Sequence, residues 1–272
     1  MNLLFLLAAL AAQQPEAQDD ASEGVPWQAQ IYSNFTNWTA EELARRDEWD
    51  LAHRCGGSLI ADGWVLTAAH CIDQKKVDKG YRIRLGAQYL DTDEGVTYRI
   101  DRMVRHADYD KPRHLNDIAL VHYVADGDTD DSAAAAPIEP IALYDDDGIE
   151  AGVEVYATGW GQLEEGKDRG FQAELTEVDL KTVDCGSLAV YRGKTDGNML
   201  CASSPDNDTC TGDSGGPLVL GQDQPVLVGV VSWGDGCYRE GGAGVYVRID
   251  RDHYRDWIDR AMASDPSINE LR

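Results

Sequence analysis

The stretch Asp208-Thr-Cys-Thr-Gly-Asp-Ser-Gly-Gly-Pro217 is the most informative segment of this 272-residue chain. Gly212 and Gly215 lie on either side of Ser214 and allow backbone torsions that other residues avoid, so amide N–H groups can approach a ligand closely. A serine hydroxyl is a weak nucleophile unless a base takes its proton. The segment therefore predicts an activated serine and a histidine elsewhere in the chain.

Two other segments supply the partners that a nucleophilic serine needs. Thr67-Ala-Ala-His-Cys71 contains His70 as the candidate base. A base histidine needs an acceptor on its second ring nitrogen to fix its tautomer, and Asp117 is the candidate. A single His or Asp is usually structural. Together, in the order His70, Asp117 and Ser214, the three residues predict nucleophilic catalysis.

The serine segment also fits the Gly-x-Ser-x-Gly elbow of α/β-hydrolases. That fold places its acid and then its histidine after the serine in the chain. Only His253 follows Ser214, on a predicted C-terminal helix with too little chain left for an α/β sheet. The order of the residues therefore decides against this alternative.

The composition restricts the partners of the chain. With 49 acidic and 24 basic residues, its formal net charge is −25 at pH 7. So acidic a chain has no basic surface for phosphate groups, which argues against binding nucleic acid or anionic membranes and favours solubility. No apolar run reaches the roughly 18 residues that a membrane-spanning helix needs.

The N-terminal segment indicates export. Residues 3–12 form a short apolar run that ends in an Ala-x-Ala pattern and is followed by polar sequence. We expect a signal peptide at residues 1–12, cleaved before Ala12 or Gln13; a buried N-terminal helix is the alternative. Six cysteines, an even number, fit an oxidising compartment. We therefore expect a secreted protein, extracellular or periplasmic.

Short runs rich in Val, Ile, Tyr and Trp recur along the chain and are separated by Gly, Asp or Pro, as in strands. They cover residues 28–32, 58–69, 81–90, 97–106, 118–124, 153–159, 226–233 and 244–249. Their spacing predicts an all-β barrel or sandwich. A segment rich in Asp and Ala, at 126–147, is interpreted as a linker between two halves.

Two segments have helical patterns. Thr39-Ala-Glu-Glu42 is a capping box, which predicts a short exposed helix. Near the C-terminus, apolar residues at helical spacing predict one buried face of a docked helix. These residues are Tyr254, Trp257, Ile258, Ala261 and Met262.

From about residue 25 to residue 262, the sequence resembles the trypsin/chymotrypsin family of serine endopeptidases. The matching motifs are Pro26-Trp-Gln28, Cys55-Gly-Gly-Ser-Leu-Ile60, Thr67–Cys71, Asp117-Ile-Ala-Leu120, Thr158-Gly-Trp-Gly161, Gly212–Pro217, Ser232-Trp-Gly234 and Gly244-Val-Tyr246. The resemblance implies two antiparallel six-stranded β-barrels with the active site between them, plus a C-terminal α-helix. It implies a peptidase domain at 13–262, with barrels at about 25–125 and 150–262, a linker at about 126–149, and a tail at 263–272.

The resemblance also implies the roles of the site residues. Ser214 attacks the scissile carbonyl, His70 acts as general base and then as general acid, and Asp117 orients His70. The backbone N–H groups of Gly212 and Ser214 form the oxyanion hole, in which one donor is typically worth about 3–4 kcal/mol. No cofactor and no metal is expected.

Asp208, six residues before the nucleophile, matches the carboxylate at the base of the S1 pocket in trypsin-like members. A buried carboxylate favours Arg or Lys, because an apolar side chain would leave it unpaired. Gly234 and Gly244 match the small residues of the pocket walls. Ser232, Trp233 and Gly234 are expected to line the cleft and pair with the substrate backbone. A solvated loop aspartate in an acidic protein is the alternative for Asp208.

The resemblance implies the disulfide pairings, which composition alone leaves open. The implied bridges are Cys55–Cys71, Cys185–Cys201 and Cys210–Cys237. The first would lie beside His70 and the third beside the S1 pocket, so reduction is expected to disturb catalysis as well as stability.

The N-terminus departs from the family pattern. Typical members begin, after proteolytic activation, with Ile-Val-Gly-Gly, whose ammonium group pairs with the aspartate before the serine, here Asp213. The chain has no such motif, and no Lys or Arg precedes Arg45. We expect signal peptidase to expose a terminus at Ala12 or Gln13 that pairs with Asp213.

Two loops also depart from the pattern. The insertion at 33–53 is longer than usual and is interpreted as a surface loop, with substrate restriction or partner binding as alternatives. The loop at 86–97 has Ala87 and Thr97 where relatives that bind calcium usually have carboxylates, so calcium is not expected there.

The function expected is hydrolysis of peptide bonds after Arg or Lys by a secreted, monomeric serine endopeptidase through an acyl-enzyme intermediate. Its expected partners are protein or peptide substrates with Arg or Lys at the cleavage site, and proteinaceous inhibitors. Two alternatives remain open: a non-catalytic binding protein on the same scaffold, and an active protease with another primary specificity.

Overall fold

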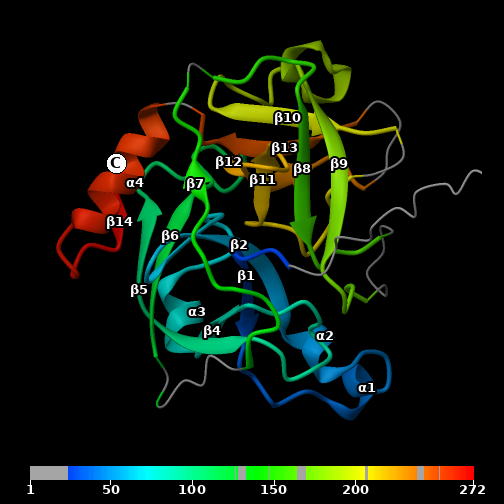
Figure 1. Cartoon of the computed structure of the whole chain (residues 1–272), viewed down its shortest axis with the longest axis vertical. Coiled ribbons are helices and arrows are strands. Elements are labelled where there is room, and N and C mark those ends of the chain that lie inside the picture. Colours follow the sequence, from blue (N-terminus) through cyan, green and yellow to red (C-terminus); the bar gives the residue numbers. More distant parts are fainter. Residues whose placement is uncertain are drawn as a thin grey trace, which may run out of the picture.

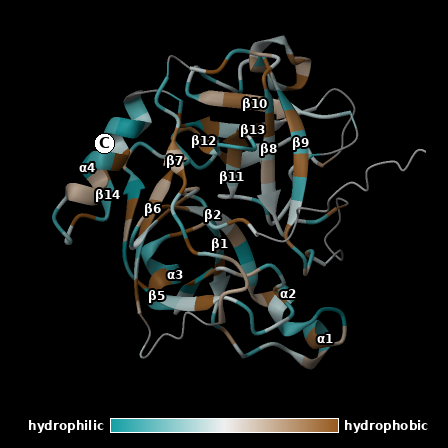
Figure 2. Ribbon diagram, in the orientation of Figure 1, coloured by the Kyte–Doolittle hydropathy of each residue, from teal (hydrophilic) through white to brown (hydrophobic). Residues whose placement is uncertain are grey.

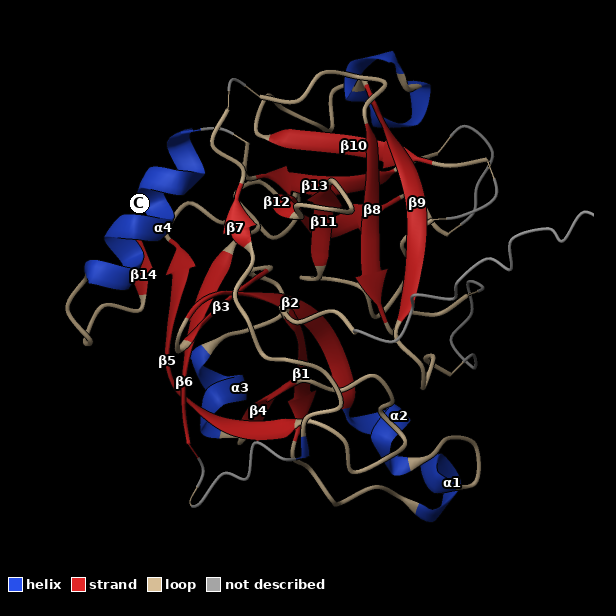
Figure 3. Cartoon of the chain, viewed as in Figure 1, coloured by secondary structure: helices blue, strands red, loops and turns tan. Residues whose placement is uncertain are grey.

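The structure is a computed structural model that describes residues 24–125, 127, 133–146, 148–163, 170–205, 208–237, 242–250 and 252–272. Two β-barrels dominate it and lie one above the other in Figure 1. Short helices lie at the periphery, and a longer C-terminal helix lies along one side (Figure 3). Within the described residues, no helix is long and apolar enough to cross a membrane.

The first barrel has strands β1 (Gln28–Ser33), β2 (His53–Ala61), β3 (Trp64–Thr67), β4 (Tyr81–Leu85), β5 (Val96–His106) and β6 (Ala119–Ala125). They are hydrogen-bonded in the order β5-β4-β1-β2-β3-β6, and β5 pairs with β6 to close the barrel. These pairings are antiparallel. The tail adds β14 (Glu270–Leu271), which runs parallel to β5 outside the closed barrel.

The second barrel has strands β8 (Glu154–Gly159), β9 (Thr176–Val183), β10 (Met199–Ser203), β11 (Pro217–Leu220), β12 (Val226–Gly234) and β13 (Gly244–Arg248). Their order is β11-β8-β9-β10-β13-β12, and β11 pairs with β12 to close this barrel. A short strand from the linker, β7 (Ala142–Leu143), runs parallel to β12. The two antiparallel six-stranded barrels confirm the predicted fold class.

The barrel cores form because apolar and polar residues alternate along the strands. In β4, Tyr81, Ile83 and Leu85 are buried, whereas Arg82 and Arg84 between them are partly exposed. Successive side chains of a strand point to opposite faces, so this sequence places every second residue inside the barrel. The inward side of β4 is therefore apolar, and its two arginines lie toward the outer surface.

The C-terminal helix α4 (Asp252–Ala263) docks by the predicted face. Tyr254, Trp257, Ile258 and Ala261 are buried, and Met262 packs partly buried against the same core. That core is shared with the first barrel, although the helix follows the second barrel in the chain.

Shorter helical elements in the described residues include α1 (Ala40–Leu43), α2 (Glu48–Ala52), α3 (Gln74–Asp78) and the 3-10 turns η2 (Cys185–Ser187) and η3 (Ala189–Tyr191). The predicted capping box is present, because Thr39 accepts a hydrogen bond from the Glu42 N–H and the Glu42 carboxylate accepts one from the Thr39 N–H. The insertion at 33–53 therefore carries two short helices.

Three strands of the second barrel were not predicted: β9, β10 and β11. In β9 the outward positions carry Glu177, Asp179 and Lys181, so the run is too polar to stand out, and Figure 2 shows its hydrophilic segments. The run predicted at 58–69 is two strands, because the chain turns at Gly63 with φ 78°. Glycine adopts this left-handed conformation without steric cost.

The described part of the linker is attached to both barrels. Ile141 is buried, and its N–H donates to the Leu59 carbonyl of the first barrel. The Tyr144 N–H donates to the Leu227 carbonyl of the second barrel. Residues 126, 128–132 and 147 of the predicted linker lie outside the described residues.

Candidate active site

The candidate site lies between the barrels, in a cleft of about 360 Å³. The first barrel contributes His70, which follows β3, and His114, which precedes β6. The second barrel contributes Ser214, just before β11, and the end of β12 at Ser232. The barrel strands thus bring together residues that lie far apart in the sequence.

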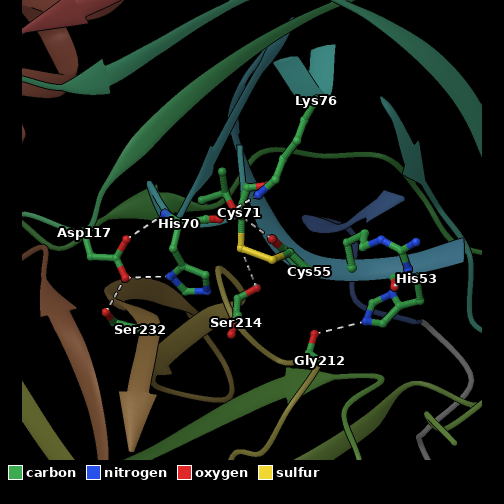
Figure 4. Close-up of a disulfide and its surroundings, with 12 residues drawn as sticks. His53, Cys55, His70, Cys71, Lys76, Asp117, Gly212, Ser214 and Ser232 are labelled. Carbon is green, nitrogen blue, oxygen red and sulfur yellow. Dashed lines mark hydrogen bonds and ion pairs between the residues drawn. A yellow bond between two sulfur atoms is a disulfide. The ribbon is translucent and has the colours of Figure 1, made fainter. Parts of the chain in front are cut away.

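Asp117 holds the His70 side chain at two points. Its Oδ1 accepts the His70 backbone N–H at 2.9 Å, and its Oδ2 accepts the ring Nδ1–H at 2.7 Å. The Ser232 hydroxyl also donates to Oδ2, at 2.6 Å. Figure 4 shows that the second ring nitrogen of His70 lies on the side of Ser214. This nitrogen is therefore presented to the serine as an acceptor.

The Asp117 side chain is completely buried. Burial by itself raises the pKa of a carboxyl group. The nearby His114 ring and the hydrogen bonds from His70 and Ser232 outweigh burial and hold the pKa of Asp117 below its usual range. The carboxylate therefore stays ionised and can stabilise a positive charge that develops on His70.

His114 is a site residue that the sequence did not single out. Its Nδ1 lies 3.6 Å from Asp117 Oδ2, and its ring stacks on Trp233 with 6.1 Å between centroids. His114 has a positive φ of 52°, which is uncommon for a residue with a side chain. No motif surrounds it, so only the fold could show that it faces the cleft.

The Ser214 segment is bound to both barrels. The Ser214 carbonyl accepts the Gly56 N–H of β2 at 2.8 Å, and the Gly215 N–H donates to Val231 of β12 at 2.7 Å. A Cβ at Gly215 would lie 2.1 Å from Thr67 Oγ1, and its φ is +81°. Glycine is required here for both its torsion and its lack of a side chain.

Gly212 is contacted by a buried histidine that the sequence did not predict. His53 Nε2 donates to the Gly212 carbonyl at 3.0 Å, and the Gln30 amide lies 3.3 Å from His53 Nδ1. Burial lowers the pKa of His53 to about 4, although the hydrogen bond to Gly212 opposes this shift. The ring is therefore neutral at neutral pH and acts as a hydrogen-bonding spacer.

Asp213 is buried beneath the serine. Its Oδ1 accepts the Gly161 N–H and its Oδ2 accepts the Cys210 N–H, both at 2.8 Å. Burial raises the pKa of Asp213 to about 6, against the effect of these bonds and with a contribution from the Asp208 charge. A Cβ at Gly161 would lie 2.2 Å from this carboxylate, so the glycine makes room for it.

The predicted partner of Asp213 is a terminus at Ala12 or Gln13. That segment and the predicted signal peptide at 1–12 lie outside the described residues.

Three of the five residues predicted for the substrate pocket line the cleft. They are Ser232, Trp233 and Gly234. Asp208 is the neighbour of the lining residue Thr209, and its charge acts on the buried Asp213. A Cβ at Gly244 would lie 2.6 Å from the Tyr246 hydroxyl, so Gly244 leaves space for that ring.

The three disulfides pair as the resemblance implied: Cys55–Cys71, Cys185–Cys201 and Cys210–Cys237. Cys71 Sγ lies 3.6 Å from the Ser214 carbonyl oxygen. Both Cys210 and Cys237 line the cleft. The third bridge is therefore part of the cleft wall, and the first lies beside the Ser214 backbone.

Two clusters of potential metal ligands occur in the described part of the chain. Cys55, Cys71 and His70 lie close together, but the two sulfurs form a disulfide. His70, His114 and Asp117 also cluster, and there the carboxylate is engaged by His70 and Ser232. Both groups are explained by the serine site.

Comparison with known proteins gives one family. The trypsin family model matches residues 15–258. The chain is 32% identical to a tryptase of Mus musculus over 253 residues, which are 88% of this chain and 85% of the tryptase. It is 36% identical to trypsin epsilon of Drosophila erecta over 214 residues, which are 77% of this chain and 78% of that protein.

A third relative is longer. The chain is 33% identical to transmembrane protease serine 11B of Homo sapiens over 220 residues, which are 78% of this chain and 50% of that protein. The chain therefore spans about half the length of this relative. With two closed barrels and a serine, a histidine and an aspartate gathered between them, the chain belongs to the trypsin family and is a serine endopeptidase.

Proposed function

We propose that this serine endopeptidase is secreted and cleaves peptide bonds after Arg or Lys, with His70, Asp117 and Ser214 as its catalytic residues. The observation that carries the proposal is the position of the His70 ring, which is bound to buried Asp117 on one side and faces Ser214 on the other. This arrangement is what a general base requires, because one ring nitrogen must remain free to accept the serine proton.

The reaction proceeds in two halves. The Ser214 oxygen attacks the scissile carbonyl carbon while His70 takes the hydroxyl proton, and the carbonyl oxygen becomes an oxyanion that the N–H groups of Gly212 and Ser214 bind. His70 then gives the proton to the leaving amine as the C–N bond breaks, which leaves an acyl-enzyme. Water, deprotonated by His70, releases the acid and regenerates Ser214.

Primary specificity is assigned to Asp208. Support comes from its register before the serine, from its position next to the lining residue Thr209, and from the glycine at 234 in the cleft wall. Two relatives are named as a tryptase and a trypsin, which agrees with a preference for basic residues. An Arg or Lys side chain would pair with the carboxylate, whereas an apolar side chain would bury it unpaired.

Secretion is supported by the three disulfides, which persist mainly in oxidising compartments. We further propose that a new N-terminal ammonium group pairs with Asp213. In the described part of the chain, the Asp213 carboxylate is bonded to backbone N–H groups and not to a cation. A buried carboxylate without a cation is unfavourable, so the position is suited to an ammonium group.

The test is hydrolysis of chromogenic peptides that end in Arg, Lys, Phe or Ala, with Ser214→Ala as control. We expect rapid cleavage of the Arg and Lys peptides that is lost in the variant. Preferred cleavage of the Phe or Ala peptide would overturn the Asp208 assignment. An absence of cleavage by correctly processed protein would overturn the catalytic assignment.

A further inference from the structure

The inserted segment at 33–53 contains a buried carboxylate that binds two separate parts of the chain. Asp50 lies in α2 and is only 4% exposed. Arg46 donates to its two carboxylate oxygens from Nε and Nη2, each at 2.6 Å. The Phe171 N–H donates to Asp50 Oδ1 at 2.8 Å, across 121 residues of sequence. Asp50 thus fastens the segment around Phe171 to the insertion.

Phe171 is contacted at the face of its ring as well as at its backbone N–H. The Arg46 guanidinium lies over the ring, 4.9 Å from its centroid. A cation over an aromatic face is attracted to it, and one that is partly buried more strongly. The pair formed by Arg46 and Asp50 therefore holds Phe171 by two independent contacts.

Phe171 in turn packs on the expected oxyanion residue. Two of its ring carbons lie 2.8 Å from the point where a Cβ of Gly212 would be. The same ring meets the edge of His53 at 4.8 Å between centroids, with an interplanar angle of 77°. His53 is the residue that donates to the Gly212 carbonyl. Phe171 and His53 therefore both restrain Gly212.

Gly212 needs such restraint because glycine is the most flexible residue of the backbone. It has φ +105° and no side chain, so its neighbours must fix the orientation of the peptide groups on either side. An oxyanion hole accelerates a reaction only when its donors are already oriented before charge develops. A small displacement of a positioned group can cost about 100-fold in rate.

We propose that Asp50 is a positioning residue, which acts through Phe171 to hold Gly212 in the conformation that binds the oxyanion of the transition state. This inference rests on the role proposed above for the Gly212 N–H. It gives the insertion, which the sequence alone marks as a surface loop, a part in the preorganisation of the active site.

The insertion also supplies a matched control. Glu41 and Arg45 form an ion pair with the same spacing as Arg46 and Asp50 but reversed in order, and their side chains are 76% and 64% exposed. Exposed pairs of this kind contribute little. Glu41→Gln therefore removes a carboxylate from the same segment without touching Phe171.

The experiment compares Asp50→Ala, Asp50→Asn, Phe171→Leu and Glu41→Gln with the unmodified enzyme. For each variant, kcat and KM are measured on one cleaved peptide substrate. Two inhibitors are also titrated. A peptide aldehyde forms an adduct with the serine whose oxygen occupies the oxyanion hole, and benzamidine occupies the primary pocket without reaching it.

We expect Asp50→Ala and Phe171→Leu to lower kcat about tenfold, with KM within about twofold, because the lost interaction acts only in the transition state. Aldehyde affinity should fall by a similar factor, and benzamidine affinity should be unchanged. Asp50→Asn keeps an acceptor for the Phe171 N–H but loses the bidentate contact with Arg46, so it should give an intermediate loss. Glu41→Gln should match the unmodified enzyme.

An unchanged kcat and aldehyde affinity in folded Asp50→Ala and Phe171→Leu would overturn the proposal. Equal losses of aldehyde and benzamidine affinity would also overturn it, because they indicate general damage to the site. Phe171→Leu leaves the buried ion pair intact, so it answers the question if Asp50→Ala does not fold. An unmodified enzyme that cleaves no peptide would instead count against the catalytic assignment itself.

Discussion

The Ser232 hydroxyl of the second barrel donates a 2.6 Å hydrogen bond to the buried Asp117 carboxylate of the first barrel. This bond couples the docking of the barrels to the charge that orients His70. We predict that Ser232→Ala lowers the free energy of unfolding by about 2 kcal/mol, as is typical for a hydrogen bond to a charged group. Urea unfolding of the purified variant measures it. An unchanged midpoint and slope would contradict the prediction.

Replacing Asp117 by Asn tests the tautomer of His70. The amide keeps the size of the carboxylate but can donate where the carboxylate only accepts, so His70 is expected to hold its proton on the nitrogen that faces Ser214. We predict a fall in kcat of about 10⁴-fold, with little change in KM. Steady-state kinetics on the preferred peptide measure both. A loss confined to KM would show that Asp117 acts in substrate binding.

Asp208 is predicted to control the choice between substrates. In Asp208→Ser the substrate Arg or Lys loses its partner at the base of the pocket, and removing one member of a buried charge pair typically costs 2–5 kcal/mol or more. We expect kcat/KM for the Arg peptide to fall about 10³-fold. The Phe and Ala peptides serve as controls, because they should be cleaved no more slowly than before. A uniform loss on all four peptides would contradict the assignment.

The pKa of Asp213 predicts how stability depends on pH. The pKa of Asp213 is about 6 in the folded protein and 3.8 for an ordinary Asp. Between these two pH values the folded protein therefore keeps a proton on Asp213 that the unfolded chain has lost. The stabilisation from this group is complete below about pH 3.8 and is lost as the pH rises through about 6. An ammonium group beside Asp213 would reverse this trend, because it favours the ionised carboxylate.

The Asp213→Asn substitution distinguishes an Asp213 without a cation from an Asp213 that pairs with an N-terminal ammonium group. Above pH 6 the substitution should raise the melting temperature of protein that retains its leader. It should lower the melting temperature of processed protein whose terminus pairs with Asp213. Melting curves from pH 4 to 8 on both forms, with the mature N-terminus sequenced, measure this. The same sign in both forms, or a mature start beyond Pro15, would contradict the pairing.

The serine, histidine and aspartate between the barrels each lie in a local motif, so the sequence alone could identify them as candidates. Ser214 lies between glycines whose torsions and close approaches are required, and His70 and Asp117 lie in compact segments of their own. The apolar strand runs by themselves predicted an all-β barrel or sandwich, and the two barrels with a site between them followed from the resemblance to the trypsin/chymotrypsin family. The helical face of α4 was equally predictable, because its apolar residues repeat at the helical spacing.

The supporting residues could not be predicted from sequence. His53, Asp50 and Phe171 meet around Gly212 from separate segments, and none of them lies in a motif. His114 lies 3.6 Å from Asp117 Oδ2 and has a positive φ of 52°, and no motif surrounds it. The unpredicted strand β9 has charged outward positions that hide its alternation. The contacts of His53 with Gly212 and of Asp50 with Phe171 join residues that are more than 100 positions apart, so no local pattern marks them.

The C-terminal segment, which is the last part of the chain to be made, packs on the first barrel. Trp257 of α4 donates to the Leu271 carbonyl, and residues 270–271 pair with β5 of the first barrel. Tyr254 donates from the same helix to Asn116, directly before Asp117. During synthesis the first barrel emerges early, yet its contacts with α4 and β14 can form only after residues 252–272 have been made. Deleting this segment should therefore damage the histidine and aspartate end of the site, although it follows the barrel that carries the serine.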